Sequence, residues 1–415
     1  MNTEPDLDMA AEHIADSAFW EADSTHRHAV FSFLRNEAPV RWFPPRTSKF
    51  QRTCSGFWAL TRYDDIWNAA RTPRVFCSRF GIDIEEKPAE LPEAPTMINM
   101  DDPEHFRMRR IVSAGFTPKR IATIDAQLRV TASQIVDAAI EQFGDGTEFD
   151  LVEHISSRLP LHAICELMGV PAADRDQLFT WTNATASLDD PTVGIAVAVE
   201  AIDALTDYAT SLGRLRREHP VDDLTSVLMG AHIDGERLTS TDYANFFSLL
   251  VGAGNETTRN AISHGVLLLT VHPEQRSVWF SAFDDHVATA VEEIVRYETP
   301  ITHMCRVLTQ DVTIRGVELA AGQKVALWYT SANRDGDAFE HPDDFDIRRP
   351  VSPQHTAFGG GGPHFCLGAS LARREIAVMF EEIHRRIPTL HVTGEPERVL
   401  SMSLNSIRSM PARLF

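Results

Sequence analysis

The chain has 415 residues and a formal net charge of −20 at pH 7, and so acidic a protein is not expected to offer a general surface to nucleic acid. Hydrophobic residues make up 43% and charged residues 24% of the sequence, which is typical of a globular enzyme. No Gly/Ser-rich linker, fixed-period repeat or low-complexity tract divides the chain, so the sequence favours one large domain.

The N-terminal residues lack the basic and apolar regions of an export signal. Apolar runs stay well below the roughly 18 residues that a membrane span requires. The cysteines are odd in number and form no CxxC pair, which disfavours a disulfide framework and suits a reducing compartment; they are Cys54, Cys77, Cys165, Cys305 and Cys366. We therefore expect a soluble, cytoplasmic protein.

Helical periodicity dominates the hydrophobic pattern, and it predicts helices over residues 121–141, 197–217, 241–270, 287–297 and 371–387. Strand-like alternation is confined to short stretches at 56–60, 312–314 and 324–328. Residues 331–362 are irregular and rich in Asp, Pro and Gly, so tertiary contacts must hold them in place. The expected fold is mainly α, or α+β by strict counting, with small peripheral β-sheets.

The stretch from Arg107 to Arg120 is basic and contains no acidic residue. In so acidic a protein this stretch favours a docking patch for an acidic partner, although a solvated helix face explains it equally well. His105 and Arg109 lie four residues apart, hence on one helix face, where two donors suit an anionic carboxylate. For His105 taken alone, a packing role is the better interpretation.

The predicted helix at 241–270 carries an acid and two hydroxyls, Glu256, Thr257 and Thr258, in the middle of an apolar sequence. Such groups are costly there unless they form hydrogen bonds. Ala253 is small enough to let a flat cofactor lie against the helix, and a threonine can bond back to the carbonyl four residues earlier. The alternative is the polar face of a half-exposed helix.

A third charged set consists of Glu293 and Arg296, three apart on one helix face, with Arg349 able to supply a second guanidinium to the same carboxylate. A Glu-x-x-Arg pair is most often a surface pair worth a few tenths of a kcal/mol.

The most informative segment runs from Phe358 through four consecutive glycines and His364 to Cys366, and a helical pattern begins just after Gly368. The glycines make the backbone thin and permissive. The N–H groups at the start of the helix point back toward the cysteine and favour a thiolate. Without these neighbours, a buried structural cysteine would be the better interpretation.

This run, FGGGGPHFCLG, resembles the cysteine-ligand signature of the cytochromes P450, with Phe358, Gly362, His364, Cys366 and Gly368 on motif positions. The resemblance implies a haem b cofactor (iron protoporphyrin IX) with Cys366 as its metal ligand, and a P450 fold over residues 19–415 after an N-terminal extension, 1–18. It places the haem propionates on His105, Arg109, Arg306 and His364. It makes Glu256 and Thr257 an acid–alcohol pair for oxygen activation, and Glu293, Arg296 and Arg349 a buried structural network.

The likeness extends from about residue 19 to residue 413 and is carried by the stretches GNETTRNAISHGVL, TAVEEIVRYETP, YTSANRD and FGGGGPHFCLGASLARRE. It is nearest to the mycobacterial group that oxidises methyl-branched lipids and sterol side chains. Hydroxylation of a terminal methyl group implies a narrow apolar funnel that delivers only the chain end. The residues expected to line it are Ile82, Ile98, Leu188, Phe247, Val251, Ala253 and Leu404.

The resemblance also implies electrons from a ferredoxin and its ferredoxin reductase. The docking face is expected at Arg107, Arg109, Arg110, Lys119, Arg120, Arg373 and Arg374. Three other functions remain open: a haem-thiolate peroxygenase or isomerase, a haem sensor or carrier without turnover, and a non-haem enzyme with Cys366 as nucleophile. The acid–alcohol pair disfavours the first two, and the third leaves the other charged sets without an explanation.

Overall fold

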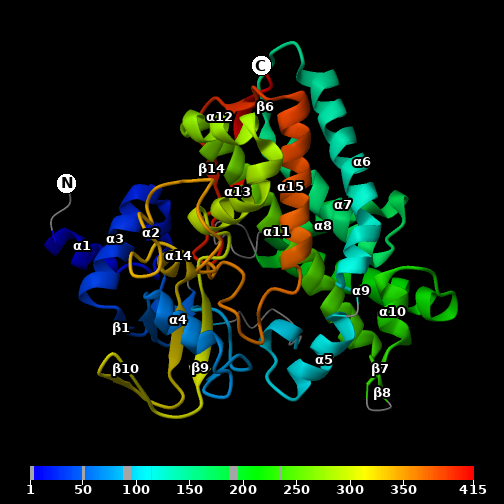
Figure 1. Ribbon diagram of the computed structural model, residues 1–415. Helices are drawn as coiled ribbons and strands as arrows, with labels where there is room; N and C mark the ends of the chain where they lie inside the picture. Colours follow the sequence, from blue (N-terminus) through cyan, green and yellow to red (C-terminus); the bar gives the residue numbers. More distant parts are fainter. Residues whose placement is uncertain (1–3, 49–51, 87–94, 114, 187–194, 234–235) are drawn as a thin grey trace.

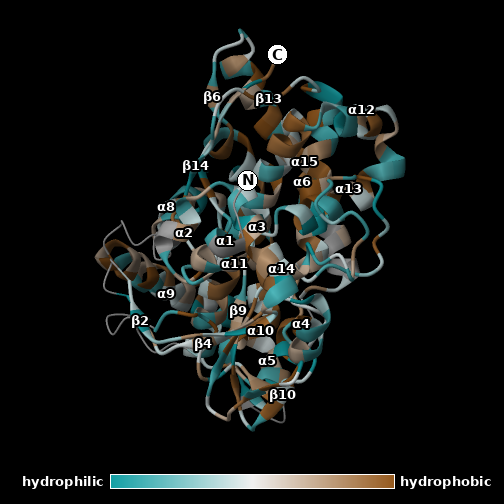
Figure 2. Cartoon of the chain, turned by 90° about the vertical axis from the view of Figure 1, so that its left-hand side faces the viewer, coloured by the Kyte–Doolittle hydropathy of each residue, from teal (hydrophilic) through white to brown (hydrophobic). Residues whose placement is uncertain are grey.

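The computed structural model describes residues 4–48, 52–86, 95–113, 115–186, 195–233 and 236–415. Amphipathic helices make up most of the fold (Figures 1 and 2), and on many of them apolar and polar faces alternate. Their bounds are α1 (Glu4–Ala11), α2 (Ser17–Glu21), α3 (Ser24–Glu37), α4 (Tyr63–Ala70), α5 (Glu104–Ser113), α6 (Pro118–Phe143), α7 (Arg158–Met168), α8 (Arg175–Ala186), α9 (Ile195–Glu218), α10 (Leu224–Gly230), α11 (Ser240–Val271), α12 (Pro273–Ser281), α13 (Phe283–Tyr297), α14 (Tyr329–Ala332) and α15 (Ala369–Arg386). None of the described helices has the length and apolar character of a membrane span.

The strands are short and form several small sheets at separate places around the helices (Figure 1). They are β1 (Val40–Phe43), β2 (Arg46–Thr47), β3 (Thr53–Cys54), β4 (Phe57–Leu60), β5 (Phe76–Cys77), β6 (Phe149–Asp150), β7 (His232–Ile233), β8 (Glu236–Arg237), β9 (Met304–Leu308), β10 (Val312–Ile314), β11 (Val317–Leu319), β12 (Lys324–Leu327), β13 (His391–Val392), β14 (Glu397–Arg398), β15 (Ile407–Ser409) and β16 (Pro411–Arg413). Within the described residues the largest sheet has five strands in the order β1-β4-β12-β9-β5.

These elements confirm the predicted mainly α fold with small sheets. The helices predicted from periodicity correspond to α6, α9, α11, α13 and α15, and the predicted strands to β4, β10 and β12. Helix α11 begins where the sequence supplies a capping box, because Thr239 and Asp242 each accept the other's backbone N–H.

The five-stranded sheet is covered on both faces. Alternate residues of its strands point to opposite sides, so Ala326 packs with the N-terminal helices while Val325 and Leu327 pack with α4. The segment that the sequence analysis set apart as an extension belongs to the first of these layers. Its Ala11 and Ile14 are fully buried in the same hydrophobic cluster as Trp328.

Two long helices frame the site. Helices α11 and α15 pack against each other, and α15 is tied to α6 by ion pairs along its length. Glu381 accepts from Arg129 at 2.6 Å, and Arg374 pairs with Asp125 near the other end of α15. The helix that follows the predicted cysteine ligand is therefore fixed on two sides.

Candidate active site

A large, mostly apolar cavity lies between α11, the start of α15 and strand β9. Cys366, Thr257 and Arg306 open onto it from these three elements. Residues separated by more than one hundred positions in the sequence thus share one chamber, and the cavity brings together most of the predicted site residues.

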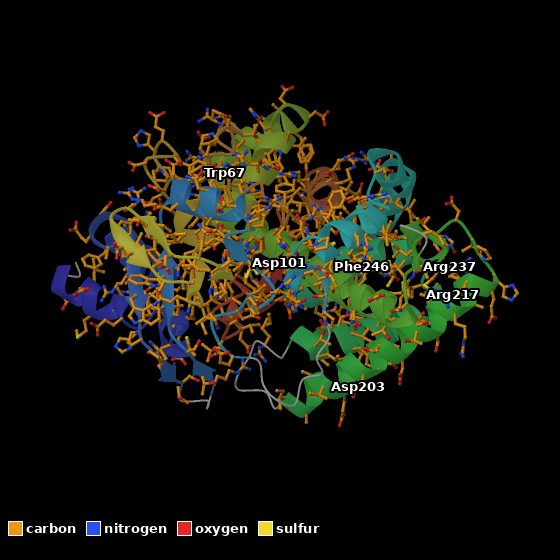
Figure 3. The ribbon with its side chains drawn as sticks, turned by 90° about the horizontal axis from the view of Figure 1, so that it is seen from below. Trp67, Asp101, Asp203, Arg217, Arg237 and Phe246 are labelled. Atoms are coloured by element: carbon orange, nitrogen blue, oxygen red, sulfur yellow. The ribbon has the colours of Figure 1, made fainter. Side chains whose placement is uncertain are left out.

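The glycine-rich loop before Cys366 is shaped by contacts with α4. Gly360 and Gly361 have positive φ angles of 65° and 74°, which L side chains rarely adopt. A Cβ on Gly362 would lie 1.8 Å from the carbonyl oxygen of Ala70, and one on Gly361 would touch Trp67, labelled in Figure 3. These glycines are therefore required by backbone conformation and close packing on α4.

The loop closes on itself, since the N–H of Cys366 donates to the carbonyl of Phe358 at 2.8 Å. Burial raises the pKa of the Cys366 thiol, while the backbone N–H groups of Gly368 and Ala369 and the charge of Arg109 act in the opposite direction. The accessible surface of Cys366 faces the cavity. The thiolate consequently needs a cation inside the cavity to be its stable form.

Four nitrogen-bearing side chains gather on one side of the cavity: His105, Arg109, Arg306 and His364. The rings of His105 and His364 lie 4.1 Å apart between centroids, and Arg109 donates to the carbonyl of Phe365 at 2.6 Å. Nε2 of His105 is buried and has no hydrogen-bond partner within the described residues. The buried Nε2 of His105 can therefore bond to a group that enters the cavity, whereas Arg109 and His364 already bond to groups of the protein.

Both histidines of this cluster are held neutral. Burial and then the charge of Arg306 lower the pKa of His364 to about 3, and burial followed by Arg109 lowers that of His105. Nε2 of His364 also meets the hydroxyl of Ser78 at 3.1 Å. Asp101, labelled in Figure 3, orders this corner by accepting the N–H of Ser78 at 2.8 Å.

Helix α11 presents one stripe to the cavity, which includes Ala253, Thr257 and Thr258. Thr257 lies as expected, and its hydroxyl donates to the carbonyl of Ala253 at 2.7 Å. Glu256 does not line the cavity, because its carboxylate lies on the side of α11 that faces Asn260 and Ser406. The predicted acid–alcohol pair is thus split between the cavity and the protein interior behind it.

The carboxylate of Glu256 is engaged on the inner side of α11. Its Oε1 pairs with Arg259, accepts from the hydroxyl of Ser406, and accepts from Asn260 at 3.2 Å. Ser406 comes from the turn before β15, so the C-terminal region holds the acid in place. Neither Arg259 nor Ser406 was singled out in the sequence, since their relation to Glu256 depends on helical phase and on a long-range contact.

Only some of the residues predicted for the substrate funnel line the cavity. Ile98 and Ala253 line the cavity, whereas Phe247 and Val251 are fully buried on the opposite side of α11, where Phe247 packs on Tyr208. The prediction for these two was wrong because Val251 stands two residues, or about 200°, from Ala253. Ile82 and Leu404 do not line the cavity either, and Leu188 is outside the described residues. The sequence analysis missed the lining residues Phe246, Leu249 and Leu250, one and two turns before Ala253.

The predicted ion network is present and buried. Glu293 accepts from Arg296 at 2.7 and 2.8 Å and from Arg349 at 3.0 Å. The side chain of Glu293 is 1% exposed, which rules out a surface pair. The N–H of Asp346 gives the carboxylate a further hydrogen bond, so both oxygens are satisfied.

Two residues of the predicted docking face do not carry free charge. Arg373 donates two hydrogen bonds to the carboxylate of Glu292, and Arg374 forms an ion pair with Asp125. The guanidinium of Arg373 also lies 4.4 Å above the ring of Phe358, which ties it to the cysteine loop. Arg109 faces the cavity, and the side chains of Lys119 and Arg120 are outside the described residues. Arg107 and Arg110 remain exposed.

Glu375 is a cavity residue that the sequence analysis missed. It is fully enclosed on α15, and its Oε2 has no partner within the described residues. Burial raises the pKa of this carboxyl well above its ordinary value. The signal was available, because Glu375 stands four residues from Leu371 and from Met379 on the buried stripe of the helix.

Substitution of Glu375 by glutamine is expected to stabilise the protein at neutral pH. The folded protein disfavours the ionised carboxyl, so wild-type stability falls as the pH rises above the ordinary pKa of 4.5, where the unfolded chain ionises. E375Q lacks this loss, and the gap between the two urea midpoints should widen between pH 4 and pH 8. The exposed variant E395Q serves as control, and a gap independent of pH would contradict the assignment.

Comparison with known proteins places this site in a family. The model of the Cytochrome P450 family matches residues 287–393. The methyl-branched lipid omega-hydroxylase of Mycobacterium tuberculosis is 46% identical over 411 residues, which cover 98% of this chain and 95% of that protein. The steroid C26-monooxygenase of Rhodococcus jostii is 39% identical over 387 residues, 91% of this chain and 80% of that protein. A solved Mycobacterium marinum cytochrome P450 in complex with pseudoionone has a TM-score of 0.89 at 39% identity, covering 96% of this chain and 97% of that one.

These similarities extend over nearly the whole chain and are not limited to the cysteine loop. They agree with the helix-rich fold and with a cavity onto which one cysteine opens. The protein therefore belongs to the cytochrome P450 family and is a haem-dependent monooxygenase.

Proposed function

We propose that this enzyme hydroxylates a terminal C–H bond of a methyl-branched lipid or isoprenoid, with haem b ligated by Cys366 and electrons supplied by a ferredoxin. The observation that carries the proposal is the apolar cavity that Cys366 and Thr257 share. An apolar chamber selects a lipophilic substrate, and the two polar groups within it mark where chemistry takes place.

The residues around the cavity fit haem. Cys366 turns its sulfur to the cavity and lacks the cation that would favour its thiolate, and a ferric or ferrous iron provides that charge. Arg109 and Arg306 offer positive charge to the two propionates, and the free Nε2 of His105 offers a hydrogen bond. The small side chain of Ala253 leaves room for a flat macrocycle to lie against the cavity face of α11.

Haem, when bound, supplies an iron centre that activates dioxygen with two electrons and two protons. The protein surrounds this chemistry with apolar walls that exclude bulk water. Thr257 holds a hydroxyl at the cavity surface, and because this hydroxyl donates to the carbonyl of Ala253, its oxygen lone pairs remain available to accept a proton. Glu256, one residue earlier, is the second member of the proposed acid–alcohol pair, and Arg259 and Ser406 hold its carboxylate on the inner side of α11.

Thr257→Ala is expected to uncouple oxygen consumption from product formation. Without the hydroxyl, protons are delivered less selectively, and the yield of product per oxygen should fall about tenfold or more while hydrogen peroxide accumulates. The measurement is the ratio of product to oxygen and to peroxide. Thr270→Ala is the matched control, since Thr270 makes the same type of bond to Val266 on the same helix. Unchanged coupling in T257A would remove Thr257 from proton delivery.

The choice of substrate rests on the apolar lining and on the names of the relatives. Phe246, Leu249, Leu250 and Ile98 form a continuous hydrocarbon surface. Titration of the ferric holoenzyme with methyl-branched fatty acids, isoprenoids and sterols, each separately, tests the substrate through the shift of the Soret band on binding. A response to linear or aromatic compounds alone would contradict the proposal.

A sterol side chain is the second candidate, because the steroid C26-monooxygenase is 39% identical to this chain. A sterol side chain also ends in a branched methyl group, so one cavity can serve both substrate classes. The sterol arm of the titration decides between them. A peroxide-driven reaction is disfavoured by the hydroxyl of Thr257 in the cavity.

We place the ferredoxin docking face around Arg107 and Arg110 of α5. The ring of Phe106 lies under the guanidinium of Arg110 at 5.8 Å and is itself exposed. Rim charges of this kind govern the association rate and its salt dependence more than the final affinity. Ferredoxin reductase completes the electron supply.

A further inference from the structure

An arginine on α15 contacts the cysteine loop through an aromatic ring. The guanidinium of Arg373 lies 4.4 Å from the centroid of the Phe358 ring, and Phe358 is buried at the wall of the cavity. The carbonyl of Phe358 in turn accepts the N–H of Cys366 at 2.8 Å. Arg373 belongs to the second turn of α15 and does not line the cavity. A positive charge is therefore placed near the cysteine from the protein side of the loop.

The charge of Arg373 is held in place from helix α13. Nη2 of Arg373 donates to Oε2 of Glu292 at 2.9 Å, and Nε donates to the other carboxylate oxygen. Oε2 of Glu292 also lies 3.1 Å from Nε2 of the buried His355. The side chains of Arg373 and Glu292 are 30% and 16% exposed, so solvent screens their charges only in part. Glu292 thus fixes a negative charge on the same guanidinium that contacts Phe358.

The charge of Arg373 acts on the cysteine itself. Burial raises the pKa of the Cys366 thiol, and the guanidinium groups of Arg109 and Arg373 both act in the opposite direction. Arg109 lines the cavity, where a propionate would neutralise its charge. Arg373 lies outside the cavity, and its counter-charge is a carboxylate of the protein. The field of Arg373 at the sulfur therefore depends on Glu292 and not on the cofactor.

We propose that Arg373 and Glu292 together set the reduction potential of the iron bound to Cys366. Both effects rest on the proposed function, in which Cys366 binds the iron and a ferredoxin supplies the electrons. One electron leaves the reduced ferredoxin and converts ferric to ferrous iron, so the iron and its thiolate together gain one negative charge. A nearby positive charge stabilises the product of this step, and a nearby negative charge opposes it. Arg373 therefore favours reduction, and Glu292 limits that effect.

The test compares the holoenzymes of Arg373→Gln, Glu292→Gln and Arg373→Lys with that of the wild type. The midpoint potential of the ferric–ferrous couple is measured by spectroscopic titration at pH 8, above the usual titration range of histidine. Arg385→Gln is the matched control. It removes the same charge from the same helix, and its side chain is 60% exposed about 18 Å further along α15. The carbon monoxide spectrum of each reduced protein reports whether the thiolate is still bound.

We expect the equilibrium constant for one-electron reduction to fall about fivefold in R373Q, because the carboxylate of Glu292 is left uncompensated beside the loop. Fivefold corresponds to about 40 mV, at about 59 mV per tenfold for one electron. In E292Q the constant should rise about twofold, because the charge of Arg373 is then uncompensated. R373K keeps the charge and should shift less than R373Q, and R385Q should match the wild type.

Opposite signs separate an electrostatic role from a structural one. If the ion pair only fixed Phe358 and α15, breaking it from either side would loosen the same contacts. R373Q and E292Q would then shift the potential in the same direction or leave it unchanged, and either result would overturn the inference. If R373Q fails to take up haem, a rise in E292Q with R373K close to the wild type supports the proposal, and a fall or no change in E292Q refutes it. A wild-type protein without the thiolate band under carbon monoxide would refute the proposed function, and this role of Arg373 with it.

Discussion

Replacement of Cys366 by serine is expected to abolish the strongly red-shifted Soret band of the reduced, carbon monoxide-treated holoenzyme. This band reports a thiolate ligand, and a serine hydroxyl cannot take the place of the sulfur as an electron-rich donor. Among the described cysteines, Cys366 alone lines the cavity, while the other four are buried in the protein body. The loss should therefore be complete, together with loss of hydroxylation.

Cys165→Ala is the control for this experiment. Cys165 is fully buried on α7, and burial raises the pKa of its thiol to about 12. The variant should lose some stability through the cavity it leaves and keep the red-shifted band. A wild-type protein without that band, or C366S with it, would show that another residue binds the iron.

Glu293→Gln is expected to reduce stability by about 3–5 kcal/mol and to yield protein poor in haem. The amide keeps the shape of the carboxylate but leaves the buried Arg296 and the half-buried Arg349 without their counter-charge. Such a loss is a large share of the roughly 5–15 kcal/mol that stabilises a typical protein. Urea unfolding and the ratio of haem to protein measure the two effects.

Asp284→Asn provides the comparison on the same helix. Asp284 is exposed in the first turn of α13, where its carboxylate contributes at most about 1 kcal/mol through the helix dipole. A change below 1 kcal/mol in E293Q would show that the segment after α14 is held by other contacts. If E293Q were less stable but kept a normal ratio of haem to protein, the network would contribute to folding and not to the retention of haem.

Much of the fold could be predicted because its long helices repeat their apolar residues with a clear period. Helix α7 was not predicted, although its sequence, RLPLHAICELM, carries a polar residue at every fourth position of an otherwise buried helix. The short strands of the C-terminal region pair over long distances, as β16 does with β6. Pairing of that kind leaves no local signal.

The candidate site, like the fold, could be predicted from the sequence only in part. Short sequence motifs indicated the cysteine loop and the Glu293 network, and both are formed in the structure. The funnel failed at Phe247 and Val251 because their hydrophobicity was considered without their angle around α11. Counting by threes and fours from Ala253 leads to Leu250, Leu249 and Phe246. The partners of Arg373 and Arg374 lie 81 and 249 residues away, beyond any local pattern.

The arginines of the Glu293 network hold the irregular segment after α14 through its main chain. Arg296 donates to the carbonyls of Asn333 at 2.7 Å, Pro342 at 2.8 Å and Asp344 at 3.2 Å. Arg349 donates to the carbonyls of Glu340, His341 and Asp344. A carbonyl oxygen is the same in every amino acid, so side chains between Asn333 and Asp344 can vary among homologues while the path of this segment is preserved. Substitutions on the outer surface of this segment therefore need not change the path by which the chain reaches Cys366.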